Sequence, residues 1–161
     1  DCAAVVRTGW DGQFFYLAAV VTDDTHWQNE EGTGIWRGDC LQLAFRAGPP
    51  NPQPGYDGSE RELGLALRPD GPFLVAWQPL GASLEGARLA VVREGRQTIY
   101  EAAIPWSVLG VDRIGPGRRL AWSMTVNDND GDGCRGWLEW TPGICGSKDS
   151  SAFGWFEAIV P

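Results

Sequence analysis

Histidine, methionine and positive charge are scarce in this 161-residue chain. It has one histidine and one methionine, and its 13 Lys and Arg residues against 21 Asp and Glu residues give a net charge of −8. A single histidine cannot supply a multi-histidine metal centre. A net negative charge repels the phosphates of nucleic acids and of anionic lipids. These scarcities argue against nucleic-acid and membrane-surface partners.

Long apolar runs and catalytic motifs are absent as well. No segment approaches the ~20 apolar residues that span a bilayer, and residues 1–4 lack the basic and apolar regions of a signal peptide. No nucleophile elbow, phosphate-binding loop or H-E-x-x-H motif occurs. A glycosidase needs two carboxylates across the scissile bond, but spacing does not single out Glu30, Glu31, Glu60 or Glu62. We expect a soluble mature domain, or an excised module, that is not an enzyme.

Helical periodicity is nearly absent. Only residues 105–110 have a helical signature, with proline first and glycine last, which predicts one short turn. Ten stretches alternate with a period of two and are separated by turn residues. Because no helix covers either face, two sheets must cover each other, so we predict a single all-β domain over residues 1–161, an antiparallel β-sandwich of jelly-roll type. The expected strands are 3–8, 14–22, 40–46, 62–67, 73–78, 87–93, 97–104, 120–126, 136–140 and 155–160.

The four cysteines lack the paired short spacings of a zinc site. Disulfides in an exported protein are the favoured interpretation, and they predict a secreted, extracellular location. Of three connectivities we favour Cys134 with Cys145, which would pin a short loop, and Cys2 with Cys40. The alternative is four buried free thiols in a cytosolic protein.

Tryptophan is in surplus, with nine residues. Tryptophan is rarely fully buried, so a number beyond the needs of a core indicates aromatic faces that are left for a partner. Among sugar, peptide, planar cofactor and protein, the acidic charge favours a neutral sugar. The connection 23–39 holds Trp27 and Trp36 as candidate stacking platforms, with Gln28 and Arg37 as candidate hydrogen-bonding partners. The alternative is that either tryptophan folds back onto the core.

One acidic segment matches the spacing of a calcium loop. Asp128, Asp130 and Asp132 alternate along the chain, and Glu139 follows at the expected interval. The strand patterns on both sides do not fit a helix-loop-helix unit, so the alternatives are an Asx-rich hairpin turn and an isolated structural calcium site. We take these four residues and Asp23 as candidate calcium ligands.

His26 and Met124 are the candidate axial ligands of a haem, since some redox domains are also β-sandwiches. Met124 lies in a strand pattern in which core packing explains a methionine, and no haem-attachment motif is present. Haem binding is therefore the least favoured alternative, and no organic cofactor is expected.

Six short motifs follow one another along the chain, at residues 9–17, 21–24, 36–43, 100–106, 126–128 and 153–154. Together they resemble family 9 carbohydrate-binding modules, which are related to DOMON-type domains. Each motif is degenerate, but the order and intervals are similar to those of the family over most of the chain. The resemblance implies a non-catalytic β-sandwich, often attached to xylanases and other polysaccharide-degrading enzymes, that holds sugar ends between two tryptophans and carries structural calcium.

The chain also departs from the family pattern. Trp36 corresponds to the first stacking tryptophan, but Ser147 stands where the second is expected. Gln42 replaces a sugar-contacting glutamate and is the third candidate hydrogen-bonding partner, residues 63–65 lack an expected arginine, and the segment that usually precedes the first strand is absent. Recognition of reducing-end glucose or xylose therefore does not carry over, and Trp27 becomes the candidate replacement platform.

Together these features predict a monomeric carbohydrate-binding module, covalently linked to a catalytic domain, that binds an oligo- or polysaccharide such as xylan or cellulose. The alternative is a structural or interaction domain that kept the sandwich and lost its ligand. Exposure of Trp36 beside polar groups would favour the first hypothesis.

Overall fold

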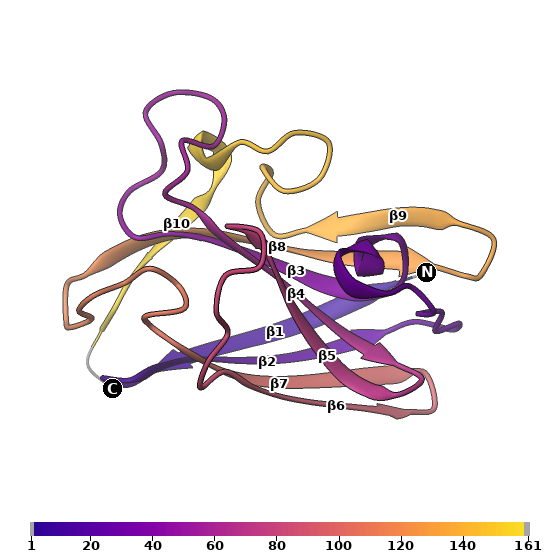
Figure 1. Cartoon of the computed structure of the whole chain (residues 1–161). Coiled ribbons are helices and arrows are strands. Elements are labelled where there is room, and N and C mark those ends of the chain that lie inside the picture. The colour runs from indigo at the N-terminus through magenta and orange to yellow at the C-terminus, as the bar shows by residue number, and fades with distance from the viewer. Residues whose placement is uncertain (1, 160–161) are drawn as a thin grey trace.

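Two antiparallel sheets are stacked on each other in the computed structural model, which describes residues 2–159 (Figure 1). The four-stranded sheet has the order β1-β2-β7-β6, with β1 (Ala3–Trp10), β2 (Phe14–Thr22), β7 (Gln97–Pro105) and β6 (Arg88–Glu94). The six-stranded sheet has the order β10-β8-β3-β4-β5, and β9 pairs with β8. Its strands are β10 (Gly154–Glu157), β8 (Arg119–Asn129), β3 (Cys40–Arg46), β4 (Arg61–Arg68), β5 (Gly71–Gln78) and β9 (Cys134–Glu139). The predicted all-β sandwich is confirmed.

Each predicted strand overlaps a strand of the structure. β10 ends at Glu157, and Val160 of the last predicted strand lies outside the described residues. The predicted helical turn at 105–110 is a pair of hydrogen-bonded turns, with the N–H of Val108 donating to the carbonyl of Pro105. The helical residues of the described chain lie instead in two 3-10 helices, η1 (Gly32–Arg37) and η2 (Ser150–Ala152), and neither is long or apolar enough to cross a membrane.

Alternating side chains of both sheets form the core. On β3, Leu41, Leu43 and Phe45 point between the sheets and are fully buried. The Phe45 ring stacks on Trp122 with their centroids 5.5 Å apart. Burial of each such side chain contributes about 1.5–3 kcal/mol to stability. Because inward and outward residues alternate, the same strands also present a second set of side chains on the outer face of the six-stranded sheet.

The core uses only part of the tryptophan surplus. Trp106 and Trp122 are buried within it, whereas four of the nine tryptophans have about half of their surface exposed. The sequence-based expectation of a surplus beyond core needs is therefore confirmed. The four exposed tryptophans are Trp36, Trp137, Trp140 and Trp155.

Neither predicted disulfide is present, because Cys2, Cys40, Cys134 and Cys145 are all free. The Cys40 side chain packs with Ile35 on the outer face of the six-stranded sheet. Cys2 packs against the core. The two residues line one small cavity, but their side chains pack in different clusters and both thiols are free.

Cys134 and Cys145 both line one cavity, but each thiol has a different partner. The Cys134 Sγ lies 3.4 Å from the carbonyl oxygen of Gly136 in its own strand. The Cys145 Sγ lies 3.7 Å from the Nε2 of Gln42 and 3.9 Å from the Oδ1 of Asn127. The loop geometry thus directs the two side chains to separate neighbours.

Candidate functional site

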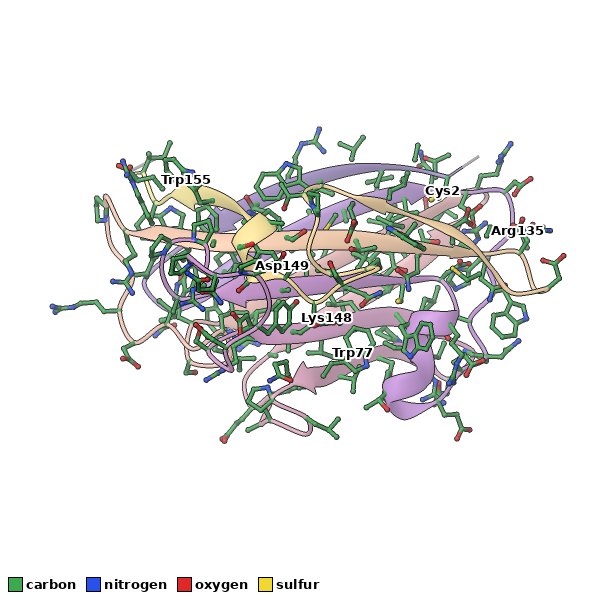
Figure 2. The ribbon with its side chains drawn as sticks, turned by 90° about the horizontal axis from the view of Figure 1, so that it is seen from above. Cys2, Trp77, Arg135, Lys148, Asp149 and Trp155 are labelled. Atoms are coloured by element: carbon green, nitrogen blue, oxygen red, sulfur yellow. The ribbon has the colours of Figure 1, made fainter. Side chains whose placement is uncertain are left out.

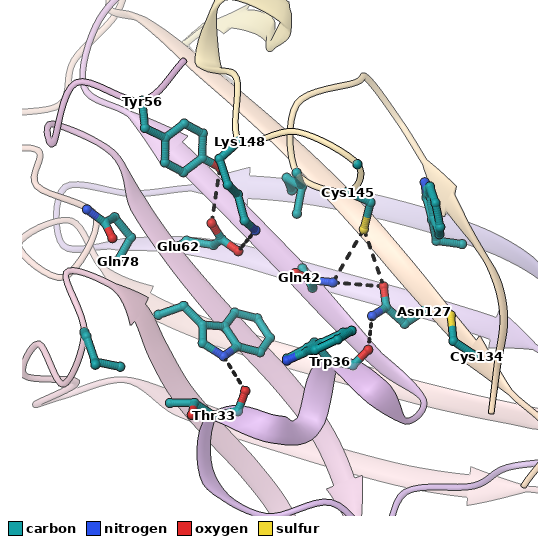
Figure 3. A pocket seen from close by; sticks show the side chains of 15 residues that line it. Thr33, Trp36, Gln42, Tyr56, Glu62, Gln78, Asn127, Cys134, Cys145 and Lys148 are labelled. Atoms are coloured by element: carbon teal, nitrogen blue, oxygen red, sulfur yellow. Dashed lines mark hydrogen bonds and ion pairs between the residues drawn. The ribbon is translucent and has the colours of Figure 1, made fainter.

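A cavity of about 560 Å³ lies on the outer face of the six-stranded sheet, below η1 and the loop that follows β9 (Figure 3). Its volume is in the range of small-molecule sites. Strands supply the floor, and η1, the 51–59 loop and the 140–149 loop supply the rim. The cavity is lined by Thr33, Trp36, Gln42, Tyr56, Glu62, Trp77, Gln78, Leu80, Asn127, Cys134, Trp137, Ile144, Cys145, Gly146 and Lys148.

Polar side chains from adjacent strands form the floor. Gln42 of β3 donates from Nε2 to the Oδ1 of Asn127 of β8 at 2.9 Å, and both residues are buried. The Nδ2 of Asn127 donates in turn to the backbone carbonyl of Trp36. This chain of hydrogen bonds satisfies the buried amides and fixes η1 on the sheet.

Trp77 forms one wall because a glycine leaves room for its ring. A Cβ atom on Gly64 would lie 2.4 Å from the Trp77 indole and 2.9 Å from Ile35, which is too close for any side chain. The indole Nε1 of Trp77 donates to the carbonyl of Thr33 at 2.8 Å. The ring is therefore held against β4 by packing on one side and by η1 on the other.

Trp36 extends this wall from η1 and is 47% exposed. The Arg37 guanidinium carbon lies 5.0 Å from the centre of the Trp36 ring, a cation–π distance. Arg37 also lies 3.4 Å from the Oε2 of Glu30, so its charge is partly compensated. Asn127 anchors the backbone of Trp36, which leaves its indole at the mouth of the cavity as an ordered, accessible aromatic surface.

Trp137 provides a third indole, on the β9 side of the cavity. In the register of β8 and β9 it lies opposite Asn127, so both point to the outer face. Trp137 is 49% exposed. The floor amides therefore lie between the indoles of Trp36 and Trp77 and the indole of Trp137.

Charged groups close the end of the cavity near the 140–149 loop. The Nζ of Lys148 lies 2.5 Å from the Oε1 of Glu62, and the hydroxyl of Tyr56 donates to the Oε2 of Glu62 at 3.2 Å. Burial, and then the adjacent Glu62, raise the pKa of Tyr56 well above its usual range, so the phenol keeps its proton. Glu62 is buried while Lys148 is half exposed, which leaves ammonium donors facing the cavity (Figure 3).

The structure brings two of the five predicted sugar-binding residues to this cavity, Trp36 and Gln42. Gln28 is buried, and its Nε2 donates to the carbonyls of Ile35 and Asp39 within its own connection. The remaining two residues also lie outside the lining. Trp27 packs against Gly131, so it is not a platform beside Trp36, and the guanidinium of Arg37 lies over the Trp36 ring.

Trp77, Trp137, Tyr56 and Lys148 were not among the predicted binding residues. For Trp137 the sequence offered one indication, because the alternation of side chains predicts a strand at 136–140. It does not show which face of a strand remains uncovered. Lys148 follows Ser147, the position at which the family pattern placed a ring, so the loop position was informative although the residue type was not.

The candidate carboxylates do not form a catalytic pair. Glu62 is the only carboxylate among the cavity-lining residues that the structure describes. Glu60 is fully buried, lies 3.0 Å from the guanidinium of Arg46 and accepts a hydrogen bond from Ser150. Hydrolysis of a glycosidic bond ordinarily requires two carboxyl groups facing the same bond. This arrangement fits binding and not cleavage.

A separate acidic cluster lies where the ends of β2 and β8 meet the 23–39 connection. Asp23, Asp39 and Asp128 bring one carboxylate oxygen each within 4.8 Å of one another, and Asp23 forms a second such group with Asp24 and Asp130. Among the described buried atoms, one oxygen each of Asp23, Asp128 and Asp130 has no hydrogen-bond partner. Burial, and then neighbouring carboxylates, raise the pKa of Asp23 and Asp128. Hard oxygen ligands with uncompensated charge fit a calcium ion.

Two predicted calcium ligands lie elsewhere. Asp132 pairs with Arg135 at 2.9 Å on the exposed turn. Glu139 accepts the backbone N–H groups of Ile144 and Cys145 and thereby orders the loop after β9. The spacing of these residues matches a calcium loop of the helix-loop-helix type. In this chain strands flank the segment, and the side chains of Asp132 and Glu139 lie away from the acidic cluster. Asp39 and Asp24 join the cluster in their place.

His26 and Met124 do not face a common site. The Nε2 of His26 is 2.9 Å from the carbonyl oxygen of Leu67, and its Nδ1 is 3.3 Å from Asp39. Met124 is 4% exposed and packs in the core. Each candidate haem ligand therefore has protein neighbours of its own.

A comparison with sequence families identifies the relationship. The profile described as "Carbohydrate family 9 binding domain-like" matches residues 1–157. The chain belongs to this family. Its resemblance to family 9 carbohydrate-binding modules is confirmed, as is its non-catalytic, carbohydrate-binding class. No curated protein has a significant sequence match to this family 9 domain.

Solved structures share the fold of this family 9 domain. A family 9 carbohydrate-binding module from Caldicellulosiruptor kristjanssonii, in complex with cellotriose, has a TM-score of 0.79 and 12% sequence identity, covering 98% of this chain and 75% of that chain. A structure of a family 9 module from the same organism, in complex with glucose, has a TM-score of 0.76 and 14% identity, with 98% and 76% covered. At this identity the sandwich is shared although most side chains differ.

Proposed function

We propose that the cavity beneath η1 binds a neutral β-linked oligosaccharide or the end of a polysaccharide, and that the domain holds it without cleaving it. One observation carries the proposal: three indoles surround a floor of buried, hydrogen-bonded amides in a single cavity. The apolar face of a sugar ring stacks on an indole, and planar amides match its hydroxyl groups.

The charges at the closed end favour a neutral ligand. The charges of Glu62 and Lys148 compensate each other. A ligand carboxylate would be attracted by the ammonium of Lys148 but repelled by the buried carboxylate of Glu62 beside it. Sugar hydroxyls both donate and accept hydrogen bonds and can therefore satisfy both groups. The related modules that bind cellotriose and glucose support a glucan as the first ligand to test.

We propose that calcium occupies the Asp23, Asp39 and Asp128 cluster and has a structural role. The bound ion would compensate clustered carboxylates and tie the end of β2 to the 23–39 connection, which carries Trp36 at the cavity. The chemistry that the ion supplies here is charge neutralisation alone. It would therefore affect sugar binding by ordering η1.

A secreted location and a linked catalytic domain remain proposals. Polymeric glucans are too large to be taken up intact, and one small cavity gives modest affinity, so the domain is useful when attached to an enzyme that acts on the same polymer. Xylan and cellulose are the candidate polymers. Detection of the protein in the culture medium, on a longer polypeptide with glycan-hydrolysing activity, would support both proposals, whereas an intracellular free-standing domain would contradict them.

Calorimetric titration with glucose, cellotriose, xylotriose and a trigalacturonate tests the ligand class. We expect micromolar or weaker dissociation constants for neutral sugars and weaker binding of the charged one. Trp137→Ala should weaken binding about tenfold, since one stacked ring contributes about 1 kcal/mol or more. Equal affinity of the variant, or preference for the galacturonate, would contradict the proposal.

A further inference from the structure

The outer face of the four-stranded sheet, on the side of the molecule away from the cavity, is unusually apolar. A solvated sheet face ordinarily alternates to polar residues. Here the register aligns four apolar side chains in one row across the sheet, and the two at its edges are more than half exposed. No other described helix or strand covers this face (Figure 1). The row comprises Val5, Val20, Ile99 and Val92. Such a patch indicates an interaction surface.

The same face is hollowed into a groove of about 520 Å³ by two neighbouring rows. In each strand a large side chain in one row is followed, two residues along, by a small one in the other row. Cross-strand pairing gives the first row as Arg7, Ala18, Glu101 and Ala90, and the second as Gly9, Tyr16, Ala103 and Arg88. Each row is therefore approximately the size complement of the other.

We propose that a second copy of this chain packs on this face, with a two-fold axis running across the strands between the two rows. Rotation about that axis places each row of one copy over the other row of its partner. Tyr16 then lies over the partner's Ala18, and Arg88 lies over the partner's Ala90. Large side chains fill the partner's hollows, as the packing of two aligned sheets requires.

Charge complementarity favours this self-association. Ala90 pairs with Glu101 across β6 and β7, so an Arg88 that lies over the partner's Ala90 reaches the partner's Glu101. The symmetry forms this ion pair twice. The groove itself carries two arginines and one glutamate, so the acidic excess of the chain lies on other surfaces.

The two middle residues of the apolar row also acquire apolar partners. The same rotation places the next rows away from the axis over each other, so that Val20 lies over the partner's Phe14 and Ile99 lies over the partner's Pro105. Phe14 of β2 and Pro105 of β7 are paired across the two strands. Strand spacings give a face of roughly 20 by 25 Å, or about 500 Å² per copy. This is at the lower end of specific interfaces, so the dimer should form reversibly with concentration. The proposal differs from the sequence-based expectation of a monomer.

The dimer would present two sugar cavities on opposite outer surfaces, because the cavity lies on the six-stranded sheet of each copy. Two cavities on one particle raise the avidity for a polymer without any new sugar contact. The proposal does not depend on which glycan is bound.

Sedimentation equilibrium over a range of protein concentrations tests the proposal. The wild type should rise from the 17.5 kDa of one chain toward twice that mass. Glu101→Arg and Arg88→Glu should each weaken dimerisation at least tenfold through like-charge contacts, and the double variant should restore it. Both positions of change are exposed, and far-UV circular dichroism checks folding. Trp36→Ala, on the other face, is the control that should dimerise as wild type does.

Three results would overturn the proposal. The first is a wild type that stays monomeric at every concentration. The second is a dimer that the single variants leave intact or the double variant does not restore, since it would use another face. The third is a loss of affinity for a short sugar such as cellotriose, which gains nothing from avidity, in monomeric Glu101→Arg; this would make the groove a sugar site.

Discussion

At the scale of single residues, the cavity depends on Gly64, which has no side chain. Gly64 is a central-strand glycine, a position that normally weakens a sheet, yet here the missing side chain lets the Trp77 indole lie on β4. The stacking surface therefore needs two residues from neighbouring strands that are complementary in size.

Gly64→Ala should displace the Trp77 ring, lower the free energy of unfolding by about 1–3 kcal/mol through overpacking, and weaken sugar binding. Chemical denaturation and calorimetric titration measure the two effects. Gly136→Ala is the matched control, because a Cβ at this strand glycine meets nothing within 4 Å. A fully stable Gly64→Ala variant with wild-type affinity would show that Trp77 is not placed by this contact.

Asp57 predicts a specific acid sensitivity. Hydrogen bonds from Ser59, and then Arg46 at 2.8 Å, lower its pKa from 3.8 to about 2. The folded state therefore binds fewer protons than the unfolded state between these values, so the stabilisation from Asp57 is present above pH 3.8 and is lost as the pH falls toward 2.

Asp57→Asn should accordingly melt at a lower temperature than the wild type near neutral pH, and this difference should shrink as the pH falls through the same window. Thermal melts followed by circular dichroism across that range check the prediction. A difference in melting temperature that stays constant with pH would contradict it.

Two of the predicted binding residues line the cavity. Trp36 was predicted from its place in the long 23–39 connection and again from the family resemblance, and Gln42 was predicted from the resemblance. Trp77 and Trp137 lie in period-two strands, where alternation separates the two faces without revealing which one stays uncovered. Gln28 has a side chain suited to sugar hydroxyls, but the backbone of its own connection uses its hydrogen bonds.

At the scale of elements, the acidic cluster joins the end of β2, the start of β3 and the end of β8. Asp39 already accepts backbone N–H groups from Trp27 and Asn129, so it fixes the 23–39 connection to β8. Asp23 and Asp128 each add a buried carboxylate oxygen that has no hydrogen-bond partner among the described groups. Folding of this corner is therefore expected to depend on a cation.

Calcium should raise the melting temperature, and a chelator should reverse the effect. At a free concentration 100 times the dissociation constant the gain is about 2.7 kcal/mol, or several degrees for a domain of this size. Asp23→Asn should abolish the gain, whereas Asp132→Asn should keep it because Asp132 pairs with Arg135 outside the cluster. Differential scanning calorimetry with and without chelator decides the matter, and a melting temperature indifferent to calcium would refute the assignment.

Strands could be predicted from sequence because alternation and turn residues are local signals. The 3-10 helix η1 could not, since its sequence Gly-Thr-Gly-Ile-Trp-Arg has no periodicity and its position depends on Asn127 and Trp77. The disulfides were wrong for a related reason. Cysteine spacing does not show how each thiol is oriented: Cys134 lies against the carbonyl of Gly136, and Cys145 lies against Gln42.

At the scale of the whole molecule, the two sheets have different outer faces. The six-stranded sheet carries the loops, the 3-10 helices and the cavity, and the four-stranded sheet carries the exposed apolar row and the charged groove. Sugar binding and self-association can therefore operate independently. Variants on one face serve as controls for the other.

The exposed tryptophans allow a matched test of where the sugar binds. Trp36 lies at the cavity, while Trp155 is exposed to a similar degree and lies outside the cavity lining, toward another end of the molecule (Figure 2). Its ring is covered on one side by Arg119, at 4.7 Å, just as Arg37 covers Trp36. The two residues differ chiefly in their surroundings.

The most direct measurement is the titration of wild type, Trp36→Ala and Trp155→Ala with cello-oligosaccharides, followed by calorimetry. Saturable binding by the wild type and Trp155→Ala, with at least a tenfold loss in Trp36→Ala, or about 1.4 kcal/mol, is the expected result. Equal affinities of all three proteins, or a loss confined to Trp155→Ala, would show that the cavity beneath η1 is not the sugar site.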